Sequence, residues 1–237
     1  LGIGVNAAMF RVVDLLFLRA PAGVQDASRV TRVYVRRAVG RLGTFTGRTT
    51  TFPTFEDLRR SGTFEWTATT RSDSMSLGRG AEALPVAVTA VSHDYFPLLG
   101  LRPALGRFFG DDEDVVGGER VAVLSHGFWL RHFAGDSAAI GRAIPLGKGT
   151  YTVIGVGPDG FAGIDLGATD LWLSIRASAG EIVPAEALTS RGWIWSEIIA
   201  RLKPGQRAED AAPLATRAYR LGAMEADSGR KLRELRV

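Results

Sequence analysis

Hydrophobic and polar residues alternate along this chain in patterns that predict strands separated by short helices. The stretch RVTRVYVRR, residues 29–37, alternates and places Val30, Val33 and Val35 in a strand. Short apolar runs rich in β-branched residues are typical of further strands. They occur over residues 64–70, 84–91, 120–125, 169–175 and 192–202.

Two regions of the chain predict more detail. AIPLGKGTYTVIGV, residues 143–156, predicts a hairpin that turns at Gly147 and Gly149. In GWIWSEIIARL, strand alternation places Trp193 and Trp195 on one face and Ile194 on the opposite face.

Helix signals lie between the strands. FPTFEDLRR, residues 52–60, predicts a short helix with Pro53 in its first turn. We expect Ser92 to cap a second helix over 93–99, which Gly100 ends in a left-handed conformation.

The pattern of strand, serine and helix repeats at Ser125, which we expect to cap a helix over 126–133. Trp129 and Phe133 lie four residues apart on that helix, so we predict that Trp129 is buried and anchors it, while Arg131 is exposed.

Residues 207–223 predict an amphipathic helix despite Pro213, and the polar tail 224–237 predicts the start of another element. Strands that lead into short helices indicate an α+β fold.

The opening stretch LGIGVNAAMFRVVDLLFL is apolar but contains an Arg11–Asp14 pair spaced for a helix. We interpret residues 1–20 as the C-terminal part of a transmembrane helix whose upstream half precedes Leu1, and residues 21–237 as the folded domain. An amphipathic helix outside a membrane is the alternative.

Composition narrows the class of protein. The chain is 46% hydrophobic and 23% charged, as expected for a folded protein, and it contains no cysteine, which excludes disulfides and thiolate metal sites. The net charge of +4 comes from scattered basic residues, which argues against a nucleic-acid partner.

Candidate chemistry is sparse. Gly155, Gly157 and Gly160 match G-x-G-x-x-G, but a turn and more glycine follow in place of the helix that a phosphate site requires. Ser125 stands between a strand and a helix, as a hydrolase nucleophile does, yet only half of the G-x-S-x-G pattern is present. A capping role for Ser125 is favoured, with a soluble serine hydrolase as the alternative.

Metal-binding patterns are also absent from the sequence. His93, His126 and His132 lack the spacing of a zinc helix. The acidic run of Asp111, Asp112, Glu113 and Asp114 lacks the alternating ligands of a calcium loop, so we expect a solvated turn. We therefore assign no catalytic, cofactor-binding or metal-binding residue, and we predict no cofactor and no enzyme activity.

Several segments together resemble one family. LGIGVNAAMFRVVDLLFLR resembles the end of the first membrane helix of FtsX-like, MacB-type ABC transporter permeases, and VSHDYFPLLGLRPALGRFF resembles a segment of their extracytoplasmic domain. In the second segment the matching positions are Tyr95, Phe96, Leu99, Gly100, Pro103, Gly106, Arg107 and Phe109. The likeness continues through residues 121–146, 151–163, 170–175 and 200–211.

The resemblance implies a MacB-like periplasmic core domain with two lobes: a porter-like mixed α/β lobe built from both ends, and a second lobe inserted in the middle. It further implies a permease of the bacterial inner membrane whose extracytoplasmic domain faces the periplasm. Two permease copies would work with a cytoplasmic ATPase, as a fused domain or a separate subunit, in efflux or related transport. The domain would relay motion (mechanotransmission) or engage an adaptor or cargo.

Two departures from the family pattern stand out. The Leu-Pro-rich exit after the first helix is here RAPAG, with Pro21 alone, and the Asn-Gly turn of the hairpin is GKG. Both leave the expected fold intact, but they leave cargo and partner choice open. A stand-alone periplasmic binding module is a further alternative.

Overall fold

The computed structural model of this chain describes residues 21–38 and 44–234. The predicted transmembrane segment at residues 1–20 lies outside the described residues. Among the helices that are described, none combines the length and the apolar character that a bilayer span requires.

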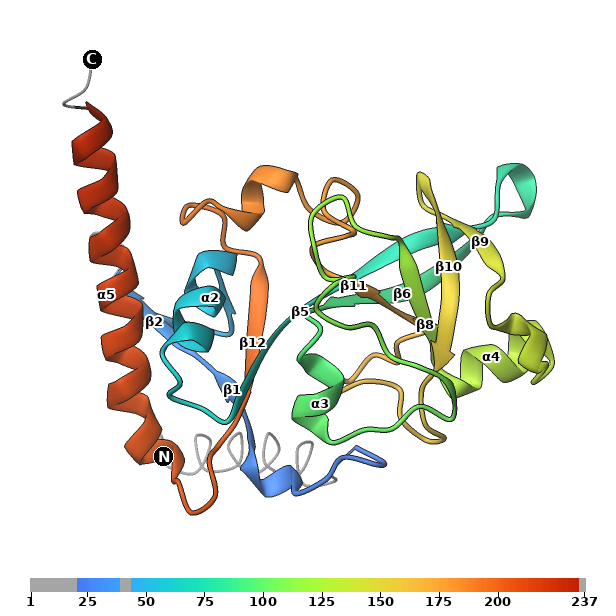
Figure 1. Cartoon of the computed structure of the whole chain (residues 1–237), viewed down its shortest axis with the longest axis horizontal. Helices are drawn as coiled ribbons and strands as arrows, with labels where there is room; N and C mark the ends of the chain where they lie inside the picture. Colours follow the sequence, from blue (N-terminus) through green and yellow to red (C-terminus); the bar gives the residue numbers. More distant parts are fainter. Residues whose placement is uncertain (1–20, 39–43, 235–237) are drawn as a thin grey trace, which may run out of the picture.

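Ten of the described strands form one mixed sheet (Figure 1). Its main path, in spatial order, is β1 (Val30–Val33), β12 (Ser196–Arg201), β5 (Trp66–Leu77), β6 (Leu84–Val91), β11 (Leu171–Ser174), β8 (Val121–Leu124), β10 (Gly149–Val156) and β7 (Leu105–Gly106). β4 (Thr49–Thr50) pairs with β12, and β9 (Ala143–Leu146) pairs with β10 and with the end of β5. β2 (Val35–Ala38) and β3 (Thr44–Gly47) form a separate two-stranded sheet.

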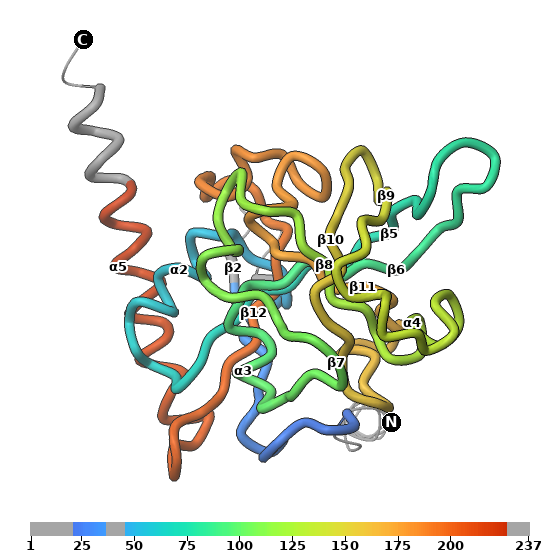
Figure 2. Tube along the Cα trace, turned by 45° about the vertical axis from the view of Figure 1, so that its right-hand side comes forward, coloured from blue at the N-terminus to red at the C-terminus, as the bar shows by residue number. Residues whose placement is uncertain are grey.

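The strand β5 runs through the middle of the molecule and belongs to both of its halves (Figure 1). Residues 66–70 pair with β12, whereas residues 70–77 pair with β6. Thr70 takes part in both ladders, opposite Glu197 on one side and Val91 on the other. The hairpin between β5 and β6 extends beyond the body of the domain (Figure 2).

Helices cover the sheet at different places. α2 (Phe52–Arg60) and α5 (Ala208–Glu234) pack together at one end, α4 (His126–Phe133) lies at the other end, and α3 (Tyr95–Leu99) lies between them (Figure 1). Four short 3₁₀ turns complete the described elements: η1 (Ala27–Arg29), η3 (Gly80–Glu82), η4 (Ser137–Ala139) and η5 (Ala185–Leu188).

The core near α3 is built from aromatic rings. The fully buried Trp172 of β11 stacks on Phe161 at 5.5 Å between ring centroids and meets the edge of Phe96 at 5.7 Å. Phe96 in turn stacks on Phe108 at 3.8 Å. These contacts fix α3 against the sheet, since aromatic pairs add to the free energy of burial.

The mixed α+β fold predicted from the sequence is confirmed. The hairpin over 143–156 forms as β9 and β10, and Tyr151 and Val153 share a buried face of β10. Gly100 ends α3 with a φ of 67°, as predicted. The division into two lobes stays a prediction, because one sheet connected by β5 runs through both groups of elements.

Several local predictions were wrong. Ser92 does not cap α3: its Oγ accepts a hydrogen bond from the backbone N of Thr69, and Asp94 stands at the N-cap position. Trp129 is only partly buried, and the side chain that anchors α4 is the fully buried Phe128.

The boundaries near the C-terminus also differ from prediction. The strand β12 begins at Ser196, so Trp193 lies before it and is exposed while Trp195 is buried. The polar tail does not start a new element, because α5 continues without a break from Ala208 to Glu234. Glutamate, alanine, lysine, arginine and leucine, which are good helix formers, make up much of the extension.

Candidate functional site

Ser125 is a helix cap in this structure. Its side chain is buried, and its Oγ accepts a hydrogen bond from the backbone N of Phe128 at 3.3 Å. The nearby His126 ring faces Asp159, with 3.2 Å between Nδ1 and Oδ1. No histidine among the described residues is hydrogen-bonded to Ser125, so a base that would activate the hydroxyl is missing there. The geometry supports the capping role and gives no support to the hydrolase alternative.

The glycines at 155–160 serve close packing of strands. Gly155 lies opposite Gly106 in the β10–β7 pair, and a Cβ at Gly155 would overlap the backbone carbonyl of Arg107. After β10 ends at Val156, residues 157–170 form turns and irregular structure with no helix. Since the glycine segment itself opens no helix, it lacks the N-terminal amides that this motif uses to bind a phosphate.

The acidic segment at 111–114 is only in part the solvated turn that the sequence predicted, since Asp111 and Asp112 are exposed but Glu113 and Asp114 are buried. Glu113 is 7% exposed and Asp114 is 2% exposed. Arg107 holds Glu113 through two nitrogen–oxygen contacts of 2.6 and 2.7 Å, and the backbone N of Gly110 donates to the same carboxylate. Hydrogen bonds to Arg107 therefore hold the pKa of Glu113 below its usual range, although burial opposes this.

Asp114 reaches the histidine that follows β6. Its Oδ2 accepts from the backbone N of His93 at 3.0 Å and lies 3.3 Å from His93 Nδ1. On the other side of the ring, His93 Nε2 lies 3.0 Å from Oδ1 of Asp94. Hydrogen bonds to Asp114 and then Asp94 raise the pKa of His93 to about 9, so the ring is an imidazolium at neutral pH.

The same carboxylate also holds the end of β11. Asp114 Oδ1 accepts from Ser174 Oγ at 2.7 Å and from the backbone N of Arg176 at 3.2 Å. Burial works against ionisation, but the bonds from His93 and Ser174 keep the pKa of Asp114 below its usual range.

We call these four residues, His93, Asp94, Asp114 and Ser174, the His93 clasp. Because both ring nitrogens are engaged by carboxylates, the imidazolium has no free lone pair and does not act as a general base near neutral pH. The clasp instead ties the β6–α3 turn, the acidic segment and the end of β11 together. Sequence reasoning missed it, since only the fold brings position 93, the acidic run and position 174 into contact.

The described residues also form no metal site. Among residues 21–38 and 44–234, no cluster of three or more histidine or carboxylate side chains has an arrangement suited to a metal ion. His126 and His132 lie on α4, away from the clasp.

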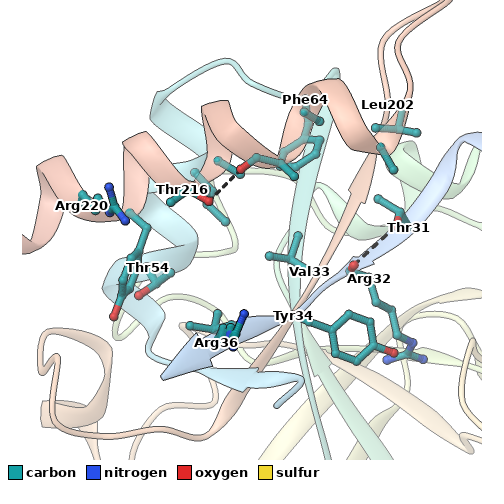
Figure 3. A pocket seen from close by; sticks show the side chains of 17 residues that line it. Thr31, Arg32, Val33, Tyr34, Arg36, Thr54, Phe64, Leu202, Thr216 and Arg220 are labelled. Atoms are coloured by element: carbon teal, nitrogen blue, oxygen red, sulfur yellow. Dashed lines mark hydrogen bonds between the residues drawn. The ribbon is translucent and has the colours of Figure 1, made fainter. Parts of the chain in front are cut away.

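A groove of about 660 Å³ opens between α5, α2 and the first two strands (Figure 3). Its apolar surface includes Leu58 and Phe64 and the alanine-rich face of α5. Arg36 and Arg220 line it from β2 and α5. No sequence motif pointed to this groove.

Beside the groove, α5 is joined to α2 at a buried carboxylate. Asp57 of α2 is 6% exposed. Its carboxylate accepts hydrogen bonds from the guanidinium of Arg191 at 2.7 and 3.1 Å and from that of Arg60 at 2.8 Å. The helix α5 presents Gly222 to this carboxylate, and a Cβ at that position would overlap it. Gly222 is therefore required for the close approach of the two helices.

Comparison with known proteins identifies the family of this chain. A profile of the MacB-like periplasmic core domain matches residues 1–218. No curated protein matches the chain.

Solved structures with a similar fold include two extracytoplasmic domains of transporters and a domain of a putative permease. The periplasmic region of MacB from Actinobacillus actinomycetemcomitans shares 17% identity at a TM-score of 0.59, over 85% of this chain and 86% of that one. The extracellular domain of the noncanonical ABC-type transporter YknZ from Gram-positive bacteria shares 15% identity at a TM-score of 0.57, over 84% and 95%. A domain of a putative permease from Porphyromonas gingivalis shares 17% identity at a TM-score of 0.55, over 76% and 78%.

Proposed function

The chain belongs to the family of MacB-like periplasmic core domains, and on this premise we propose that it relays ATPase-driven motion within an ABC transporter permease. It is an extracytoplasmic domain of such a permease. The finer proposal is that it works without catalysis, in efflux or related transport across the bacterial inner membrane, as part of a dimer that a cytoplasmic ATPase drives. An adaptor or cargo would bind on the periplasmic side.

The observation that carries the relay proposal is the pairing of segments from both ends of the described chain. Val30 of β1 lies opposite Arg201 of β12, which leads into α5. The backbone N of Leu202 donates to Arg29 O at 2.8 Å, and Arg29 Nε donates back to Leu202 O at 3.0 Å. A displacement of one segment is thus carried to the other through direct hydrogen bonds.

Rigid connections would pass this displacement on to the far end of the domain. The strand β5 pairs with β12 and continues into the ladder with β6, and the His93 clasp fixes the turn after β6. Such continuous, well-packed elements transmit motion, whereas a flexible linker dissipates it.

The proposal is tested by loosening the connection to the membrane. In the full permease, a flexible Gly-Ser segment inserted after Arg19 should leave the domain folded and ATP hydrolysis largely intact, while transport falls. The same insertion after Gly117, where a Cβ would meet no atom within 4 Å, serves as the control and should leave transport unchanged. Transport that persists with the insertion after Arg19 would indicate a passive docking surface in place of a relay.

A further inference from the structure

We propose that the groove between α5, α2 and β1–β2 binds an anionic membrane amphiphile, a lipid with one acyl chain and an anionic phosphate headgroup. This binding site goes beyond the relay function and does not depend on it. The size of the groove, its apolar surface and its positive charge support the proposal (Figure 3).

The size of the groove fits one small lipid. Its volume of about 660 Å³ falls within the range of roughly 300 to 1,000 Å³ that is typical of small-molecule sites. The space exists because α5 faces β1 with alanines, at positions 208, 211, 212 and 215, where larger side chains would close the gap.

Apolar residues cover much of the groove. Leu58, Phe64 and Leu202 line it together with the alanines of α5, and Val33 lies on β1. An acyl chain laid on this surface leaves water, which is favourable by roughly 25 cal/mol for each Å² of apolar surface buried.

The charged residues of the lining have one sign. Arg32, Arg36 and Arg220 line the groove, and no aspartate or glutamate does. Arg32 is already neutralised, since it pairs with Asp165 at 2.6 Å and with Glu197 at 2.9 Å.

The other two arginines are available to a ligand. Arg36 and Arg220 are exposed, and neither forms an ion pair with any residue that the structure describes. Two guanidinium groups beside an apolar surface complement a lipid phosphate, because arginine binds phosphate oxygens in a bidentate manner. A cationic or zwitterionic headgroup would gain less from this arrangement.

Tyr34 and Tyr219 also line the groove, and Tyr34 is 55% exposed. Tyrosine suits such a position because its ring packs on apolar groups while its hydroxyl bonds to a headgroup or water. The groove thus combines an apolar surface for the chain with hydrogen-bond donors for the headgroup.

Calorimetric titration of the 237-residue chain with a 14-carbon lysophosphatidylglycerol, below its critical micelle concentration, tests the proposal. The lysophosphatidylcholine of equal chain length and inorganic phosphate serve as comparison ligands. The anionic lysolipid should bind most tightly, and phosphate alone should give no measurable heat because it cannot use the apolar surface.

Substitutions locate the binding. Arg36→Ala and Arg220→Ala should each weaken binding roughly tenfold, as expected for the loss of a charge-assisted hydrogen bond. Arg217→Ala is the matched control, because Arg217 is exposed on the same helix but does not line the groove. Ala212→Trp should block binding by filling the space, with circular dichroism confirming the fold of each variant.

Three results would overturn the proposal: no binding of the anionic lysolipid, equal affinity for both lysolipids, or equal losses in Arg217→Ala and the two groove variants. If Ala212→Trp does not fold, the arginine variants decide alone, since they add no volume to the groove. Failure of any of these tests leaves the relay proposal standing, because transport in the insertion experiment is a separate measurement.

Discussion

At the scale of single residues, His93 shows how burial and charge act together. The ring lies between two carboxylates that are themselves shielded from water, Asp94 at 7% and Asp114 at 2% exposure. A buried carboxylate is costly unless a positive partner and hydrogen bonds satisfy it. The imidazolium supplies both, and Ser174 completes the set for Asp114.

This arrangement makes stability depend on pH in a defined direction. The pKa of His93 is raised from 6.5 to about 9 in the folded protein, so its contribution is fully present below pH 6.5 and is lost as pH rises through 9. We expect the free-energy difference between wild type and His93→Gln to shrink from pH 6 to pH 9.5. Urea unfolding at several pH values measures this free-energy difference. A difference that stays constant with pH would contradict the stabilisation of the clasp by a charged His93.

Exposed and buried carboxylates of the acidic segment provide a matched comparison. Asp114→Asn should cost about 3 kcal/mol or more, because it leaves buried partners unsatisfied. Asp111→Asn should change stability by about 0.5 kcal/mol or less, since Asp111 is 85% exposed beside the same histidine. Similar losses for the two variants would show that the segment is solvated after all.

Gly100 illustrates a second residue-scale constraint. It has a φ of 67°, and a Cβ there would lie 2.8 Å from Cβ of Gln25. We expect Gly100→Val to cost on the order of 1 kcal/mol or more. Gly117→Val is the control, with a φ of 74° but no atom within 4 Å of the added Cβ, and thermal melts should show a smaller loss for it.

At the scale of elements, α4 shows how one buried side chain can attach a helix to the sheet. The helix α4 is held by Phe128, which is fully buried, whereas Trp129 covers the surface and donates from Nε1 to Asp136 O at 2.9 Å. The helical period predicted one apolar side, but it did not say which residue of that side faces the sheet.

The two aromatic residues of α4 should therefore differ on truncation. Phe128→Ala should cost about 3 to 5 kcal/mol, as for other fully buried aromatics, and Trp129→Ala should cost less. Arg131→Ala should cost about 1 kcal/mol or less, because its pair with Asp170 is exposed. Chemical denaturation ranks the three variants, and a larger loss for Trp129→Ala would reverse the assignment of the anchor.

The contact between α2 and α5 gives a prediction with an internal control. In an ordinary helix Gly→Ala stabilises by about 1 kcal/mol, but Gly222→Ala should destabilise because its Cβ overlaps the Asp57 carboxylate. In an Asp57→Ala background the same change should become neutral or favourable. Chemical unfolding of the two single variants and the double variant measures the coupling between the positions. Additive changes in the free energy of unfolding would contradict the contact between Gly222 and Asp57.

At the scale of the whole molecule, the shared strand β5 unites the two groups of elements. Thr70 of β5 pairs with β12 on one side and with β6 on the other. Unfolding of the strands on either side therefore removes pairing partners of the same strand. The family resemblance implies two lobes, and from this connectivity we expect them to unfold as one unit.

Hydrogen exchange tests that cooperativity. We expect the amides of Ile199 in β12 and Val153 in β10 to reach the same opening free energy as urea is added, because both open only when the whole sheet unfolds. Two separate plateaus would show that the groups unfold independently, as two lobes joined by a strand.

Much of the local structure followed from the sequence alone. Alternation and apolar runs predicted most of the described strands, and Pro53, Ser125 and Gly100 marked helix ends where the structure has them, because these signals act over a few residues. The resemblance of segments spread along the chain also pointed to the family that the profile match over residues 1–218 shows.

Contacts between distant positions were decided only by the tertiary structure. The polar half of β5 gave no strand signal, since its exposed residues are ordered by pairing with β6. The sequence predicts that Asp114 is solvated, but the fold brings it to His93 and Ser174, which lie 21 and 60 residues away along the chain. Burial and charge pairing depend on neighbours in space, and a single sequence does not contain them.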